Sequence, residues 1–241
     1  MESKVVGSAQ GGARISSGAD SRQDYQTPAD FKAAVEARFG RIVFDLAAHA
    51  RNALCQDYYA PRYFFENLRL PASEFKGGSS KLIDMNALGW GFKKHDKKKD
   101  EYHLFRRTPN DDPKAFRLDA LAQDWHGDLS GRADLRDGKG ICWLNCEFDD
   151  CATWAEKCVA EGKLGLPIAL LTPASVGADW ARDFIWPHAD VYMLNGRICF
   201  DGKDPYPKDC MLSIFGQKSK IRFLAEDRVR LVWDWRTDRI F

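Results

Sequence analysis

The chain has 241 residues, of which 44% are hydrophobic and 12% aromatic, and this composition can fill a globular core and excludes global disorder. The formal net charge is +1, so bulk charge does not indicate a phosphate-rich partner, and any nucleic-acid contact must come from a local basic patch. No apolar stretch is long enough to cross a bilayer, and the N-terminus lacks the apolar core of a signal peptide, so we expect no membrane association.

Cysteine and histidine spacing predicts no metal site. The seven cysteines include no CxxC pair, and the five histidines show no spacing typical of metal ligands. Cys142 and Cys199 lie within strand-like runs and are expected to be buried thiols. An odd number of scattered cysteines favours a reducing environment, so we expect a cytoplasmic protein.

The first ordered element is a helix that follows a flexible tail. Residues 1–23 are rich in Gly, Ser and Ala and are predicted to be disordered. Thr27 is the predicted N-cap and Pro28 the first helical residue. The apolar residues at i, i+4 and i+8 then form one face, which consists of Phe31, Val35 and Phe39.

A strand at residues 41–45 ends in the carboxylate of Asp45, and a segment without clear periodicity comes after it. Residues 61–117 mix aromatic and charged side chains, and we interpret them as an insertion within one domain that spans 24–241. Residues 91–105 are predicted to form a hairpin with a basic tip. The densest basic cluster of the chain lies there: Lys93, Lys94, Lys97, Lys98 and Lys99.

Strands and helices alternate after the insertion, which predicts an α/β fold with a mostly parallel sheet flanked by helices and late antiparallel additions. Residues 150–162 and 178–186 are predicted helices. Asn195-Gly196 is typical of a two-residue hairpin turn. The predicted strands are 140–144, 167–173, 190–194, 197–200, 210–215 and an edge strand within 221–235.

The most informative stretch is Asn145-Cys146-Glu147-Phe148, which follows the buried strand 140–144. A polar residue at the carboxyl end of such a strand lies where open α/β sheets build their binding sites. We therefore treat these four residues as the candidate catalytic segment.

An ordered set of short segments runs along the chain: Asp-Tyr-Gln-Thr-Pro at 24–28, Phe-Asp-Leu-Ala-Ala at 44–48, Asn-Ala-Leu-Cys at 52–55, Leu-Ala-Gln-Asp-Trp at 121–125, Trp-Leu-Asn at 143–145, Leu-Leu-Thr-Pro-Ala at 170–174, Gly-Arg-Ile-Cys-Phe at 196–200 and Pro-Tyr-Pro at 205–207. These segments, in this order, resemble the phage-type DNA N-6-adenine methyltransferases, a Dam-like family. That resemblance implies a Rossmann-like fold, the cofactor S-adenosylmethionine, double-stranded DNA as partner and, if a phage encodes the chain, the host cytoplasm as location.

The resemblance also implies a set of cofactor-binding residues. Thr27 and Pro28 correspond to the segment that closes over the methionine end of the cofactor, and Asp45 to an acid that binds its ammonium group or ribose. Leu46-Ala47-Ala48 stands where a glycine-rich loop is usual, and Ala47 belongs to this loop. Asp124, followed by Trp125, corresponds to an acid that accepts a hydrogen bond from the cofactor adenine.

Residues 145–148 match the family's Asn/Asp-Pro-Pro-aromatic motif at both ends only. By resemblance, Asn145 and the carbonyl of Cys146 accept hydrogen bonds from the target amine, and Phe148 stacks on the extruded base. Cys146 and Glu147 replace two prolines, so the loop loses their fixed φ angles, and Glu147 adds a carboxylate.

Several interpretations stay open from the sequence. The target can be the amino group of adenine or of cytosine, or the chain is a catalytically silent relative that binds DNA or cofactor. A cysteine–glutamate mechanism at cytosine carbon 5 is disfavoured, because neighbouring side chains on an extended segment point to opposite faces.

The same residues also have purely structural interpretations. Thr27-Pro28 is explained as a helix start, and Asp45 and Asp124 as caps of turns. The lysine cluster is either a phosphate-binding patch or a solvated loop. The sequence indicates no oligomeric state and no recognition sequence.

Overall fold

The computed structural model describes a subset of the chain, and the statements below concern that part. The described residues are 14–16, 26–61, 63–71, 90–96, 101–110, 112–200, 202, 204–217 and 230–241, with the backbone alone for 14–16, 63–71, 90–96, 101–109 and 230.

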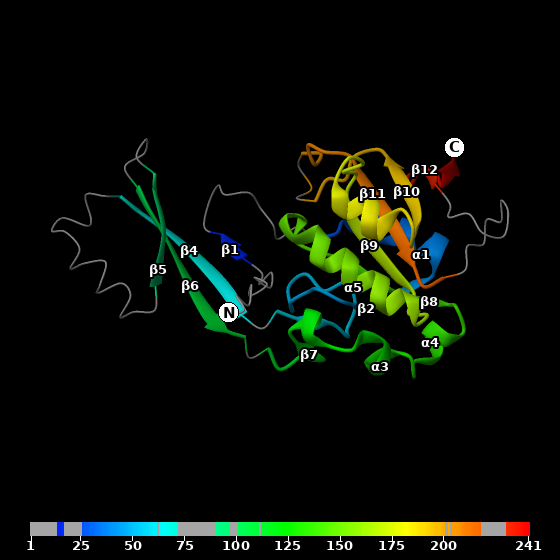
Figure 1. Cartoon of the computed structure of the whole chain (residues 1–241), viewed down its shortest axis with the longest axis horizontal. Helices are drawn as coiled ribbons and strands as arrows, with labels where there is room; N and C mark the ends of the chain where they lie inside the picture. The colour runs from blue at the N-terminus through cyan, green and yellow to red at the C-terminus, as the bar shows by residue number, and fades with distance from the viewer. Residues whose placement is uncertain are drawn as a thin grey trace, which may run out of the picture.

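The main body of the protein is a mixed, mostly parallel sheet of seven strands in the order β13-β12-β10-β11-β9-β8-β2 (Figure 1). Three neighbouring strands, β2, β8 and β9, are parallel, and β11 runs antiparallel to both β9 and β10. With its helices, this sheet confirms the predicted α/β class and is compatible with a Rossmann-like fold. The strand bounds are β2 Arg41–Asp45, β8 Gly140–Asn145, β9 Ile168–Pro173, β10 Asp190–Asn195, β11 Cys210–Phe215, β12 Arg230–Asp234 and β13 Arg239–Ile240.

Helices pack on both faces of this sheet. On one face, α1 (Ala29–Phe39) buries Phe31, Val35 and Phe39, as its periodicity predicts. On the other face, α5 (Cys151–Lys163) lies along the sheet (Figure 1). The shorter helices are η2 (Ala120–Ala122), α3 (Trp125–Leu129), α4 (Ala133–Arg136), η3 (Phe148–Asp150) and the π-helical η4 (Ala181–Ile185).

Strand β8 is buried on both faces, and its side chains alternate between the two cores. Ile141 and Trp143 join the cluster of α1, whereas Cys142 and Leu144 join the cluster of α5. A strand covered on both faces has no polar face, which explains its continuous apolar run in the sequence. The alternation continues beyond the apolar run, so it also decides which way the next residues point.

Three strands of the insertion and one from the N-terminal tail form a second sheet in the order β1-β4-β6-β5. The hairpin predicted at 91–105 is confirmed by the antiparallel pair β5 and β6, whose tip at 97–100 lies outside the described residues. Within the tail predicted for 1–23, three residues instead form β1, which runs parallel to β4. The bounds are β1 Arg14–Ser16, β4 Tyr63–Pro71, β5 Trp90–Asp96 and β6 Glu101–Pro109.

A short stem joins the insertion to the main body. Strand β3 (Tyr59–Ala60) pairs in parallel with β7 (Arg117–Leu118). Buried Asn110 donates from its Nδ2 to the carbonyl of Pro61 at 2.7 Å, and it accepts from the backbone N–H of Asp112 at 2.9 Å. The chain therefore leaves the main body and returns to it at one point, so the inserted sheet is added without interrupting the parallel strands.

Three local predictions are wrong. Residues 197–200 form no strand, and Asn195-Gly196 closes no two-residue hairpin, because β10 pairs instead with β11 and β12. The strand predicted at the sheet edge, β12, lies between β10 and β13. In these cases pairing between distant strands overrides the local signal. The helix predicted at 178–186 is confirmed by helical residues at 179–185, of which Ala181–Ile185 are π-helical.

No helix in the described part of the chain has the length and apolar character to cross a membrane.

Buried Glu161, near the end of α5, joins that helix to α3. Its carboxylate accepts from the backbone N–H of His126 at 2.8 Å and pairs with Lys157 at 2.6 Å. We expect Glu161→Ala to lower the free energy of unfolding by about 3 kcal/mol, because it leaves a cation and backbone donors without their partner. Chemical denaturation measures this, with Glu156→Ala on the exposed side of α5 as control. Equal losses in both variants would contradict the role of Glu161.

Candidate functional site

Asp45 and Asn145 end two neighbouring parallel strands at the same edge of the sheet. Asp45 lies opposite Trp143 in the pairing of β2 with β8, and Asn145 is two residues further along β8. Residues two apart in a strand point to the same face, so Trp143 and Asn145 both face the side of α1. The structure thus brings the two residues together at the edge where parallel α/β sheets bind ligands.

Thr27 contacts Asn145 directly, although 118 positions separate them in the chain. The Nδ2 of Asn145 donates to the Oγ1 of Thr27 at 3.4 Å, and Thr27 is buried. The prediction that Thr27 caps the helix is wrong: α1 begins at Ala29, and its N-cap is Pro28, which makes no side-chain capping bond. Pro28 accepts from the backbone N–H of Lys32 through its carbonyl at 2.9 Å.

The carboxylate of Asp45 holds the loop that follows its strand. It accepts from the backbone N–H of Leu54 at 3.1 Å and from that of Ala47 at 3.3 Å. Only 3% of Asp45 is exposed, and this burial raises the pKa of its carboxyl from 3.8 to about 6. Lys32 lies close by and donates from its Nζ to the carbonyl of Leu54 at 2.7 Å. Ala47, which was predicted to bind the cofactor, thus contacts Asp45 through its backbone N–H.

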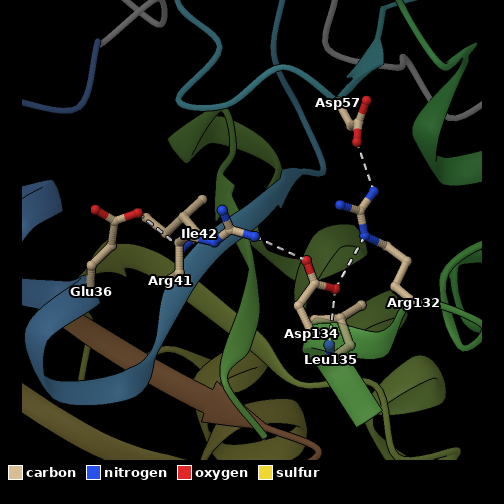
Figure 2. Close-up of polar contacts among 7 residues, drawn as sticks. All are labelled: Glu36, Arg41, Ile42, Asp57, Arg132, Asp134 and Leu135. Atoms are coloured by element: carbon tan, nitrogen blue, oxygen red, sulfur yellow. Dashed lines mark hydrogen bonds and ion pairs between the residues drawn. The ribbon is translucent and has the colours of Figure 1, made fainter. Parts of the chain in front are cut away.

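A network of charged side chains holds Asp57, whose backbone bonds that of Asp45 (Figure 2). Arg132 donates from Nη1 to the carboxylate of Asp57 at 2.7 Å and from Nε to that of Asp134 at 3.4 Å. Arg41, at the start of β2, also donates to Asp134 at 3.4 Å. The carbonyl of Asp57 accepts from the backbone N–H of Asp45 at 3.0 Å, so the network fixes the chain beside that residue.

Cys146 packs into the core beneath α5, where 4% of it is exposed. A hydrogen bond with the thiol of Cys151, together with burial, raises the pKa of the Cys146 thiol well above its usual range. A thiol that is buried and protonated is a poor nucleophile. Glu147, the next residue, is partly exposed.

The backbone at Glu147 has φ −61° and ψ 125°. Proline fixes φ at about −65°, so Glu147 adopts the angle that a proline would impose. The turn after Asn145 therefore has a proline-like conformation without a proline, and η3 follows it directly.

Phe148 lies in a cluster of three aromatic rings. Its ring centroid is 5.5 Å from that of Tyr206 and 6.2 Å from that of Phe200, and all three pairs are edge-to-face. Phe200 and Tyr206 were not predicted as site residues. The sequence contained a signal for both residues, because each lies in a segment that carries the family resemblance, at 196–200 and 205–207.

Asp124 and Trp125 are tied to α3 and α5. Asp124 is the N-cap of α3, where its carboxylate accepts from the backbone N–H of Gly127 at 2.8 Å. Trp125 is fully buried, its backbone N–H donates to Glu161, and its ring stacks on that of Trp154 at 6.3 Å. A role of Asp124 in cofactor binding stays a prediction.

The predicted DNA-binding lysines are only partly within the described chain. Lys93 and Lys94 lie on β5, where the pairing with β6 shifts register. Lys97, Lys98 and Lys99 fall outside the described residues. No group of three or more potential metal ligands occurs in the described part of the chain.

No family model matches the chain, and searches among curated proteins and solved structures also find no match.

The buried carboxyl of Asp45 makes stability depend on pH. Its pKa of about 6 in the folded state exceeds the ordinary 3.8, so the folded protein binds this proton more tightly. The contribution to stability is fully present below pH 4 and is lost as pH rises through 6, by up to about 3 kcal/mol. We expect Asp45→Asn to remove this dependence.

Denaturant unfolding between pH 4 and 7.5 measures the effect as the difference between wild type and Asp45→Asn. Asp149→Asn, at an exposed position of η3, is the matched control and should follow the wild type. A constant difference between wild type and Asp45→Asn across this range would refute the raised pKa.

Proposed function

We propose that the chain is a methyltransferase that transfers the methyl group of S-adenosylmethionine to the exocyclic amine of adenine in double-stranded DNA. The observation that carries this proposal is the position of Asn145 at the carboxyl end of β8, beside the end of β2 and in contact with Thr27. The ordered resemblance to phage-type adenine methyltransferases supports the choice of reaction. Support from the fold is limited to its class and to the edge at which these residues meet.

The residues at this edge fit the cofactor in part. Each oxygen of Asp45 accepts one backbone N–H and retains a second lone pair, which suits an ammonium or ribose hydroxyl donor. Because Asp45 is 3% exposed, such a group reaches it only when the loop at 46–54 shifts. Asp124 caps α3 through one carboxylate oxygen, and its contact with the cofactor adenine remains part of the proposal. When bound, S-adenosylmethionine supplies an electrophilic methyl group on a sulfonium.

In the proposed mechanism the adenine leaves the duplex, since its amine is out of reach inside the stack. Asn145 Oδ1 and the carbonyl of Cys146 accept the N–H groups of the amine, which favours a nucleophilic nitrogen. This role of Cys146 needs its backbone alone, so it is compatible with a thiol packed under α5. Phe148, supported by Phe200 and Tyr206, supplies an aromatic surface for the base.

A catalytically silent relative that binds DNA is the second candidate. The observation that favours it is that both carboxylate oxygens of Asp45 accept hydrogen bonds from the loop, from the backbone N–H groups of Ala47 and Leu54, as in a purely structural role. A methylation mechanism through Cys146 as nucleophile is not proposed, because the thiol faces the α5 core.

Transfer of a labelled methyl group from S-adenosylmethionine to DNA of mixed sequence separates the two candidates. Cofactor binding without label in DNA would exclude the enzyme. If label appears, mass analysis of the nucleosides identifies the base, and methylcytosine in place of methyladenine would exclude adenine as the target.

Asn145→Ala is expected to lower kcat at least 100-fold, since it removes an acceptor that acts on the reacting amine. Asn195→Ala is the matched control, because Asn195 is exposed at the carboxyl end of β10, which points to the same edge of the sheet. The control should keep kcat within twofold. Equal activity of Asn145→Ala and wild type would show that Asn145 has no catalytic role.

Glu147→Pro tests whether the loop has the geometry of the family motif. Because φ at Glu147 is already −61°, we expect the variant to fold, with a free energy of unfolding unchanged or raised by about 0.5 kcal/mol. Methyl transfer should persist or increase. Glu147→Gln is the control that removes the charge without changing the backbone. A collapse of stability in Glu147→Pro alone would contradict the proposed conformation.

A further inference from the structure

Thr27 has a hydroxyl that the helix does not use. The sequence places Thr27 at a typical capping position, but α1 begins at Ala29, and its N-cap is Pro28, which makes no side-chain capping bond. Thr27 is 6% exposed, and burying a hydroxyl without a hydrogen-bond partner costs free energy. The partner is the Nδ2 of Asn145, at 3.4 Å.

Helix α1 holds Thr27 rigidly over the end of β8. The ring of Phe31 packs edge-to-face against Trp143 at 6.2 Å and against Trp235 at 5.2 Å. Phe31 is one turn beyond Thr27, and Trp143 is two residues before Asn145 on the same face of the strand. One helix-to-sheet contact therefore sets the position of the hydroxyl relative to the amide.

The two ends of an asparagine amide are chemically different. Nδ2 donates two hydrogen bonds, whereas Oδ1 accepts them. An amine as substrate needs the acceptor, so only one of the two orientations of the amide serves the proposed reaction. A hydroxyl can bond either end of the amide, and in the structure it accepts from Nδ2, so the contact fixes the amide with Nδ2 at Thr27.

We infer that Thr27 is a positioning residue, whose hydroxyl accepts from the Nδ2 of Asn145 and so holds the side-chain amide in place at the carboxyl end of β8 for the reaction with the substrate amine. This inference rests on the proposed function for its catalytic meaning. It differs from the expectation from family resemblance that Thr27 contacts the cofactor, and it assigns the residue a role in kcat and none in cofactor affinity.

The test compares Thr27→Val, which keeps the shape and removes the hydroxyl, with Thr27→Ser, which keeps the hydroxyl. One hydrogen bond of ordinary strength corresponds to a factor of about 5 to 10, so kcat of Thr27→Val should fall about tenfold. Thr27→Ser should stay within twofold of wild type. The dissociation constant of S-adenosylhomocysteine, measured by calorimetry, should change less than twofold in both.

Thr172→Val is the matched control. Thr172 is fully buried on β9, beside Leu171, which pairs with Asn145, and its hydroxyl makes no hydrogen bond within the described chain. It lies on the opposite face from Leu171, so its loss should leave kcat unchanged. Equal kcat of Thr27→Val and Thr27→Ser, or a loss confined to cofactor affinity, would overturn the inference.

A second measurement does not depend on activity. In the ¹⁵N-labelled full chain, the side-chain NH₂ signal of Asn145 is identified by its disappearance in Asn145→Asp. Its exchange with solvent should be about fivefold faster in Thr27→Val than in wild type or Thr27→Ser. Equal exchange rates would refute the contact. Slow exchange in the wild type together with no methyl transfer would retain the contact and reject the proposed function.

Discussion

The burial of β8 between two helices is the constraint on which the rest of the structure depends. Trp143 packs under α1, and Leu144 packs under α5, so the strand cannot rotate or slip without exposing one of the two cores. The same alternation of side chains between the two faces continues beyond Leu144. It directs Asn145 to the side of α1 and Cys146 into the core of α5, and it thereby separates the residue that can meet a ligand from the residue that completes the packing.

The mismatch with the family motif at Cys146 and Glu147 is therefore less disruptive than the residue types suggest. Two prolines would fix the backbone and remove two donors. In the structure, Cys146 anchors the chain by burying its thiol, and Glu147 adopts a proline-like φ of −61°. Packing supplies the conformation that the prolines would supply covalently. The carboxylate of Glu147 is the one chemical addition at this turn.

The edge of the sheet is assembled from segments that are distant in the chain. Thr27 comes before the first strand, and Phe200 and Tyr206 come after the fourth strand of the sheet in chain order. Asp45 is tied to Leu54 and, through Asp57, to the Arg132 network. These contacts link the edge to several distant segments, and a ligand that reaches Asp45 has to displace the loop at 46–54 that its carboxylate holds.

The sequence by itself determined the α/β class, the buried strands at 41–45 and 140–144, and the placement of Asp45 and Asn145 at strand ends, because hydrophobic periodicity is local. It could not determine which structural role Asp124 and Thr27 have. Both residue types favour capping, and the local signal is the same for each. Only the tertiary structure decided that Asp124 caps α3, whereas Thr27 is carried to Asn145 by the packing of α1. The pairing of β10 with β11 in place of a local hairpin has the same cause: contacts between distant segments outweigh a turn signal of two residues.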